Sequence, residues 1–379
     1  MSTLVTLVGS GRATTRTELA AATGVSRTTV TQRIGRLIDL GLLIEHGNGR
    51  SDGGRPPTML SVDPAAGVLL AADLGATHCL LAVSDLGGNT LLRAGSDIDI
   101  DAGPTAVLRH VREGFDQLLA GVRRPAADVR GIGIGVPGPV EFSTGTVVRP
   151  PIMSGWDGAC VPELLGGFPG VPILVDNDVN VMALGEHRHH RDVANLLYIK
   201  IGTGIGCGIV TAGRLYRGTD GAAGDIGHIR LPGHENTVCH CGKTGCVEAV
   251  ASGAALVREL RAQGLDVTNS RDIARLALEG NATARRAVRI AGRRLGEVLA
   301  AVVSFHNPGR IVIGGAFDAL AEDLLAEIKA VVYRGVLPLA TRSLRIEAGA
   351  LGDQAAIVGA TALALEHALS PAGLAPLLN

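Results

Sequence analysis

Three cysteines and one histidine carry the clearest chemistry in this sequence. Cys239, Cys241 and Cys246 lie within eight residues of one another, and His228 precedes them by eleven residues. Three thiolates and one imidazole make up the ligand set of a closed tetrahedral zinc site. Free thiols and a disulfide are the alternatives, although a bridge between C-x-C neighbours would be strained. We expect a structural zinc ion, because four protein ligands leave no position for a reactive water.

A second polar cluster comes at the end of an apolar strand and directly before an expected helix. It consists of Asp176, Asn177 and Asp178. Ligands of open α/β sheets bind beside the carboxyl ends of strands, where an amide and a carboxylate can grip neighbouring hydroxyls and accept a proton from one. The alternative is that these side chains only cap the helix. Glu248 and Asp225 lie within three residues of the expected zinc ligands, so the same zinc site would hold them in place.

Two glycine-rich turns have the composition of phosphate-binding loops. Residues 73–77 read Asp-Leu-Gly-Ala-Thr, residues 202–206 read Gly-Thr-Gly-Ile-Gly, and each turn joins two apolar strands. Backbone N–H groups of such turns can bind phosphate oxygens, and the hydroxyls of Thr77 and Thr203 lie close by. Either turn alone is ordinary hairpin chemistry. Two of them in facing lobes predict a common cleft.

The first 60 residues have the pattern of a helix, a tight turn and a second helix. Thr15 and Glu18 form a capping box that opens the first helix, which ends before Gly24. Ser26 caps the second helix, and Gly41 supplies its stop signal. A helix pair of this kind is typical of a DNA-binding module.

The exposed face of the second helix and a following wing provide the candidate DNA contacts. Strands over 42–45 and 58–62 would form the wing. Short polar side chains can read base edges in a major groove, whereas arginines bind phosphates or enter a minor groove. A small helical cap with a solvated loop is the alternative. The expected DNA-binding residues are Arg27, Thr28, Thr29, Gln32, Arg33 and Arg36 on the helix and Arg55 in the wing.

Composition restricts the classes to which the whole chain can belong. Its 379 residues are 46% hydrophobic and 2% aromatic and include 53 glycines, which favours an aliphatic, turn-rich α/β fold over a coiled coil or a disordered chain. Net charge is −1, yet residues 1–57 carry +3 and the remainder −4, so nucleic-acid contact must be local. No apolar run is long enough to span a bilayer, and we expect a cytoplasmic protein without a membrane partner.

Taken together, these motifs resemble the ROK family, which groups bacterial sugar-responsive repressors with sugar kinases. The resemblance covers essentially the whole chain and implies a two-lobed, actin/hexokinase-like (ribonuclease H-like) α/β body behind a winged helix-turn-helix. It rests on Asp73-Leu-Gly-Ala-Thr77, Gly133-Ile-Gly-Val-Pro-Gly138, Asn177-Asp178-Val-Asn180, Gly202-Thr-Gly-Ile-Gly206, Gly227-His228 with the cysteine cluster through Glu248, and Asn307-Pro308 before Ile311-Val-Ile-Gly-Gly315. The implied domains are 1–63 for the winged helix-turn-helix, 66–185 plus 351–379 for a small lobe, and 186–350 for a large lobe with the zinc loop and a dimer surface.

The resemblance also implies roles for single residues. The sugar would be bound by Asn177, Asp178, Asp225, His228 and Glu248, and Asp178 would be the catalytic base of a kinase. If Mg-ATP is bound at all, the residues around it would be Asp73, Gly75, Thr77, Gly202, Thr203, Gly204, Gly314 and Gly315. Two positions depart from the kinase pattern. Ala76 replaces a second glycine, and Asp225 replaces a glutamate, which draws the carboxylate back by roughly 1.5 Å.

Two functions therefore compete. The first is a sugar-responsive transcriptional regulator, in the repressor sense, with operator DNA and a sugar effector as partners and with a homodimer or homotetramer as the assembly. The second is an ATP-dependent sugar kinase, and one chain can combine both activities. We favour the regulator, because nothing in a kinase mechanism requires a capped helix pair and a basic wing. Enzyme activity stays open, since Asp178 and both phosphate turns are present.

Overall fold

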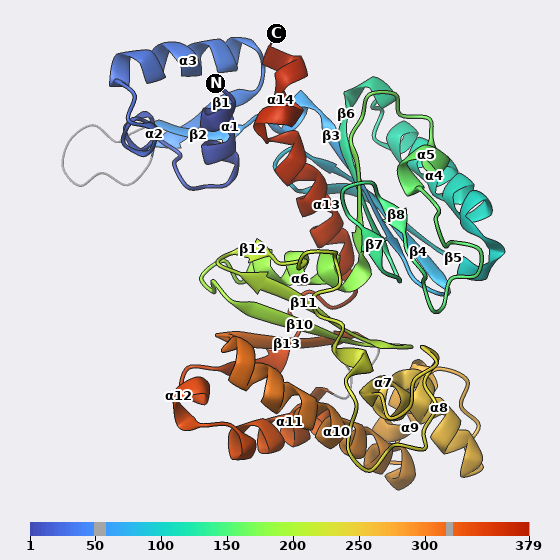
Figure 1. Cartoon of the computed structure of the whole chain (residues 1–379). Helices are drawn as coiled ribbons and strands as arrows, with labels where there is room; N and C mark the ends of the chain where they lie inside the picture. Colours follow the sequence, from blue (N-terminus) through green and yellow to red (C-terminus); the bar gives the residue numbers. More distant parts are fainter. Residues whose placement is uncertain (49–57, 316–320, 379) are drawn as a thin grey trace.

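The computed structural model of the chain describes residues 1–48, 58–315 and 321–378 (Figure 1). A small, mainly helical head is followed by two α/β lobes, each of which is built on a five-stranded sheet. This arrangement confirms the predicted fold class. None of the helices in the described part of the chain combines the length and the apolar composition needed to cross a bilayer.

The head contains the predicted helix pair and wing. Its elements are α1 (Ser2–Gly9), α2 (Arg16–Thr23), α3 (Arg27–Asp39) and the antiparallel strands β1 (Leu43–Asn48) and β2 (Thr58–Val62). Thr15 and Glu18 form the expected capping box at the start of α2. The Ser26 hydroxyl accepts the Thr29 N–H at the start of α3. The helix α1 precedes this pair as the third helix of the head.

The first lobe has the strand order β5-β4-β3-β6-β9. Its elements are β3 (Val68–Leu74), β4 (His78–Asp85), β5 (Thr90–Asp97), α4 (Pro104–Gly121), β6 (Val129–Val136), β7 (Val140–Glu141), β8 (Thr146–Val147), α5 (Val161–Leu165) and β9 (Ile173–Asn177). Every residue of β3 is buried, because helices cover both faces of the sheet and an uninterrupted apolar run is needed there. The parallel strands β3, β6 and β9 bring Asp73 and Asn177 to the same edge.

The second lobe repeats the hairpin and parallel strand of the first, in the order β12-β11-β10-β13-β14. Its strands are β10 (Leu196–Ile201), β11 (Ile205–Thr211), β12 (Arg214–Leu215), β13 (Arg310–Gly315) and β14 (Arg345–Ala348). Its helices are α6 (Asp178–His189), α7 (Val247–Ala251), α8 (Gly253–Ala262), α9 (Ser270–Leu278), α10 (Ala282–His306), α11 (Ala321–Gly335) and α12 (Pro338–Thr341). The apolar core of this lobe lies between the sheet and the helices α7 to α11.

Two helices, α6 and α13 (Ala355–Ala368), pack against each other between the two sheets (Figure 1). Their backbones are in direct contact at two glycines. A Cβ atom on Gly359 would overlap the carbonyl oxygen of Val181, and one on Gly185 would overlap that of Ala355. Only a residue without a side chain permits this approach. The lobes are therefore joined by a tightly packed helix pair.

The head rests on the C-terminal helices of the chain. Leu4, Val5 and Val8 of α1 share one apolar core with Leu369 and with Leu374 of α14 (Pro371–Leu378). The Thr6 hydroxyl donates a hydrogen bond to the Leu369 carbonyl oxygen. Because α13 runs directly into this region, a single helix connects the junction of the lobes with the head (Figure 1).

Candidate functional site

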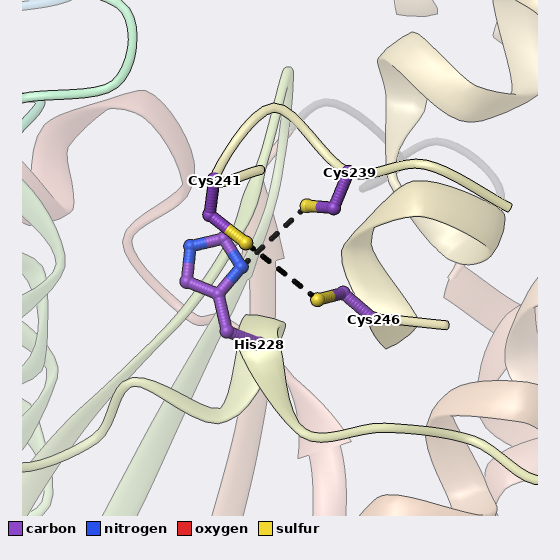
Figure 2. Close-up of side chains that lie close together, drawn as sticks. All are labelled: His228, Cys239, Cys241 and Cys246. Carbon is purple, nitrogen blue, oxygen red and sulfur yellow. Dashed lines mark hydrogen bonds between the residues drawn. The ribbon is translucent and has the colours of Figure 1, made fainter. Parts of the chain in front are cut away.

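The four predicted metal ligands converge in the second lobe (Figure 2). His228 ends a short 3-10 helix, Cys239 and Cys241 lie in the following loop, and Cys246 is the N-cap residue of α7. Backbone hydrogen bonds from Cys239 to Lys243 and from Gly242 to Cys239 close the loop into a tight turn. The ligand atoms of all four side chains lie within 4.8 Å of one another.

The spacing of these atoms fits a tetrahedral metal ion of the size of zinc. The Cys241 and Cys246 sulfurs are 3.8 Å apart, and Cys239 Sγ is 3.6 Å from His228 Nδ1. Zinc–sulfur bonds of about 2.3 Å and zinc–nitrogen bonds of about 2.0 Å at tetrahedral angles give edges of about 3.8 Å and about 3.5 Å. A disulfide is ruled out as the alternative, since all six cysteines are free. The structure thus contains the predicted set of three cysteines and one histidine.

The thiols differ in how readily they lose a proton. Burial raises the pKa of Cys239 to about 12. Burial also opposes ionisation of Cys241, but the Lys243 N–H and the two neighbouring thiols lower the pKa of Cys241 below its ordinary value. A metal ion binds the thiolate form, so metal uptake must displace the protons that remain.

His228 and Glu248 connect the metal ligands with the residues around them. With Nδ1 of His228 on the metal side, its Nε2 faces Asp225 Oδ1 at 4.0 Å. Glu248 Oε2 accepts the Ile205 N–H at 3.0 Å, and Glu248 Oε1 lies 3.9 Å from Cys239 Sγ. Glu248 therefore links the metal loop to the glycine turn at 202–206.

The residues of the polar cluster at the end of β9 have different hydrogen-bond partners. Asp176 is bound by Arg217 at 2.7 Å and by Asn180 at 2.8 Å, so it stabilises the fold locally. Asn177 caps α6 by accepting the Val179 N–H, and its amide donates to the Gly138 carbonyl oxygen at 3.0 Å. The prediction that Asn177 caps the following helix is thus correct.

Asp178 and Glu248 flank the same hairpin. Asp178 is the first residue of α6, and its buried carboxylate pairs with the Lys200 ammonium of β10, immediately before the turn at 202–206. Glu248 bonds to Ile205 on the other side of that turn. The structure therefore brings the strand-end cluster and the loop of the three cysteines to one region.

The candidate phosphate turns lie in different lobes. Asp73 is buried at the end of β3, and Thr77 is exposed in the turn that follows. In the other lobe the exposed Thr203 stands in the turn after β10, while Lys200 and Ile201 pair in register with Gly314 and Gly315 of β13. Burial opposes protonation of Lys200, but Asp178 and Asp73 outweigh it and raise the pKa of Lys200. A carboxylate at the end of β3 in one lobe thus acts on a cation in β10 of the other lobe.

Sequence reasoning overlooked Lys200 and His78. Lys200 is one of three lysines in the chain and stands in an otherwise apolar strand, which is the signal that would have singled it out. His78 Nε2 lies 3.4 Å from Asp73 Oδ2. Its position directly after the turn at 73–77 carried no comparable signal.

The candidate DNA contacts on α3 lie on its solvent face. Val30, Ile34 and Leu37 are fully buried on the opposite face. Thr29 is half-buried, and its hydroxyl lies 2.9 Å from the Ser26 hydroxyl, with which it forms a hydrogen bond. The exposed candidates are Arg27, Thr28, Gln32, Arg33 and Arg36. Arg55 lies outside the described residues.

Comparison with known proteins finds matches for two parts of the chain. The profile of the ROK family matches residues 69–367, and a profile of winged helix-turn-helix DNA-binding domains matches residues 7–44. The xylose repressor of Caldicellulosiruptor bescii is 29% identical over 371 residues, which covers 94% of this chain and 92% of the repressor.

Solved structures from both branches of the family resemble this chain. A ROK family transcriptional regulator, described as a homolog of the E. coli MLC protein, has a TM-score of 0.83 at 27% identity and covers 100% of this chain and 96% of its own. A ROK family glucokinase from Streptomyces griseus, solved with glucose and AMPPNP, has a TM-score of 0.67 at 28% identity. That match covers 99% of the kinase but 79% of this chain.

Proposed function

Since this chain belongs to the ROK family, we propose that it is a sugar-responsive transcriptional repressor, which binds operator DNA through its winged helix-turn-helix and a sugar at the junction of its two lobes. The observation that carries this proposal is that a head with the helices and strands of a winged helix-turn-helix is packed onto the helix that runs from that junction. The full-length similarity to a xylose repressor supports it. Such a protein would act in the cytoplasm, where operator DNA is accessible.

The sugar is held, in this proposal, by Asn177, Asp178, Asp225, His228 and Glu248. Carboxylates accept hydrogen bonds from hydroxyls, and the free nitrogen of His228 completes a set suited to a polyhydroxylated ring. Asp225 is the most exposed of these carboxylates, with 61% of its side chain accessible, so it can reach a ligand that enters from solvent.

The metal is zinc in this proposal, and its role is structural. It would be bound by His228, Cys239, Cys241 and Cys246, and it would fix the loop that positions Glu248. The observed edges support zinc, and four protein ligands leave no open coordination position.

The signal passes from sugar to DNA through helices. Asp178 begins α6, α6 contacts α13 at Gly185 and Gly359, and the end of α13 supports α1 of the head. A sugar that closes the lobes would shift α13 and, with it, the head. The sugar must bind one arrangement better than the other for this to occur. In this scheme 1–63 is the head, 66–185 plus 351–379 the small lobe, and 186–350 the large lobe.

A homodimer or homotetramer would place two heads on one operator. Half-sites are read about 34 Å apart or at multiples of that distance, so a small rotation of two heads changes the fit. Exposed apolar side chains at the ends of α10 and α12 support a contact between copies on the large lobe. They are Phe305 (93% exposed), Leu337 (78%) and Leu339 (74%).

Operator release tests the proposal. Duplexes selected from a random DNA pool by the full-length protein are titrated by fluorescence anisotropy, with free monosaccharides added in turn, including xylose, glucose and N-acetylglucosamine. We expect one sugar to weaken DNA binding and to raise the melting temperature of the protein. Asn177→Ala should abolish both effects. If sugar still released DNA from the Asn177→Ala variant after loss of sugar binding, the assigned site would be wrong.

A further inference from the structure

Lys200 pairs with the carboxylate of Asp178, which a sugar kinase would need to be unpaired. Its ammonium pairs with the Asp178 carboxylate, and only 8% of the Asp178 side chain is accessible. The Lys200 stem runs along the first glycine of the phosphate turn, with Cε 3.5 Å from the position of a Cβ on Gly202. Asp73 acts on the same ammonium electrostatically from the other lobe. The Lys200 ammonium is thus paired with Asp178, and the negative charge of Asp73 favours its charged form.

His78 covers the other phosphate turn. Its ring occupies the space over Gly75, because a Cβ there would overlap three ring atoms of His78. The same ring points Nε2 at Asp73 Oδ2, 3.4 Å away. The backbone of this turn is therefore covered at Gly75 by the side chain of the first residue of β4.

These contacts do not fit a magnesium nucleotide. Phosphoryl transfer from ATP depends on magnesium held beside the phosphates, on backbone that approaches those phosphates and on a base for the attacking hydroxyl. Here Lys200 occupies Asp178, His78 occupies Asp73, and the Gly75 backbone is covered. The Asp178 oxygen that would accept the hydroxyl proton already accepts a hydrogen bond from Lys200, and magnesium would have to displace an ammonium group that belongs to the chain itself.

We infer that Lys200 and His78 close the phosphate end of the site to Mg-ATP, so that the protein binds its sugar and releases it unphosphorylated. This inference rests on the proposed sugar site and adds to it that sugar affinity does not depend on nucleotide. In a sensor, this independence makes occupancy report the sugar concentration alone.

Nucleotide binding tests the inference. The full-length wild-type protein is titrated calorimetrically with Mg-AMPPNP, alone and with the sugar that releases the operator, and is assayed for transfer of phosphate from Mg-ATP. We expect no saturable nucleotide binding at millimolar concentration and no transfer. The double variant Lys200→Met/His78→Ala should bind Mg-AMPPNP at least about tenfold more tightly than wild type. Lys200→Arg keeps the positive charge and should remain without nucleotide.

Matched controls separate this inference from a general disturbance. Lys329→Met/His110→Ala removes a lysine from α11 and a histidine from α4, and it should behave as wild type. If the double variant does not fold, each single variant makes the same test. The inference would be overturned if wild type bound Mg-AMPPNP as tightly as the variants. It would also be overturned if the variants bound sugar but showed no gain in nucleotide affinity. Operator release by sugar, measured on the same samples, reports the repressor function separately.

Discussion

At the scale of single residues, the metal ligands show how one loop can serve two purposes. Cys239 lies 3.6 Å from the metal-side nitrogen of His228 and 3.9 Å from Glu248. Glu248 in turn accepts the N–H of Ile205 in the glycine turn. Loss of the metal would therefore release a proposed sugar ligand as well as a loop.

Removing one thiol should reveal this connection. In Cys241→Ser we expect loss of the metal, at least about tenfold weaker sugar binding and a lower melting temperature, because a structural metal contributes its binding energy to folding. Metal content by plasma mass spectrometry, calorimetry with the sugar and thermal unfolding measure the three effects. Cys160→Ser, at a half-buried thiol outside the site, is the control and should retain the metal. Undiminished sugar affinity in a metal-free protein would contradict the connection.

At the scale of elements, α3 separates its packing face from the exposed face that we propose to contact DNA. Its buried stripe fixes the helix on the head, whereas Gln32 and Arg36 project to solvent. An amide can make paired hydrogen bonds to a base, and a guanidinium neutralises phosphate. Different substitutions on one helix should therefore have different consequences for DNA binding.

We expect Gln32→Ala to relax sequence preference at one base pair by about 1–3 kcal/mol. Arg36→Ala should weaken binding to all sequences alike and reduce the slope of log affinity against log salt by about 1. Anisotropy titrations with the selected operator and its single-base variants, over a range of salt concentrations, measure both. Equal losses on every duplex for Gln32→Ala would show that this residue does not read a base.

The contact between α6 and α13 is a second element-scale feature that can be tested. Gly359→Ala puts a methyl group against the Val181 carbonyl oxygen, and overpacking of this kind costs about 1–3 kcal/mol of unfolding free energy. The added methyl group must push α6 and α13 apart. Because the proposed signal passes through the contact between these helices, sugar should also release DNA less efficiently from this variant. Urea unfolding and anisotropy measure the two effects. Gly335→Ala on α11, whose added Cβ meets Ala300 at an ordinary 3.7 Å, should leave both unchanged.

At the scale of the whole molecule, the head is part of the same packed body as the small lobe. Leu369 is 6% exposed and lies in the apolar core that the head shares with α13 and α14. In the proposed mechanism, this attachment is what would allow a movement between the lobes to displace the head. A head on a flexible linker would bind DNA whether or not sugar is present.

Leu369→Ala should weaken this attachment, with a cost of about 2–5 kcal/mol for truncating a buried leucine. We expect operator binding to persist but its response to sugar to shrink, and the head to unfold before the lobes. Anisotropy and thermal unfolding followed by two probes measure this. Leu278→Ala, at a 63% exposed leucine of α9, is the control. A full sugar response in Leu369→Ala would argue against transmission through the α13 end.

Local signals carried much of the prediction. The caps at Thr15 and Ser26 depend on hydrogen bonds that span three residues, and each is present in the structure. The cysteine cluster likewise lies within one short loop, so its spacing alone indicates a metal site. These features are readable in order along the chain because the partners are sequence neighbours.

Contacts between distant segments were settled by the tertiary structure alone. Lys200 meets Asp178 because β10 and α6 pack together, and Gly359 meets Val181 although the two residues are 178 positions apart in the sequence. The head packs against Leu369, so residues from the two ends of the chain lie in one apolar core. Periodicity and caps describe which face of an element is buried, but not which other element covers it. For that reason composition and motifs predicted a metal loop, a DNA-binding head and an α/β body, whereas packing decided that Lys200 pairs with Asp178 and that one helix connects the lobes to the head.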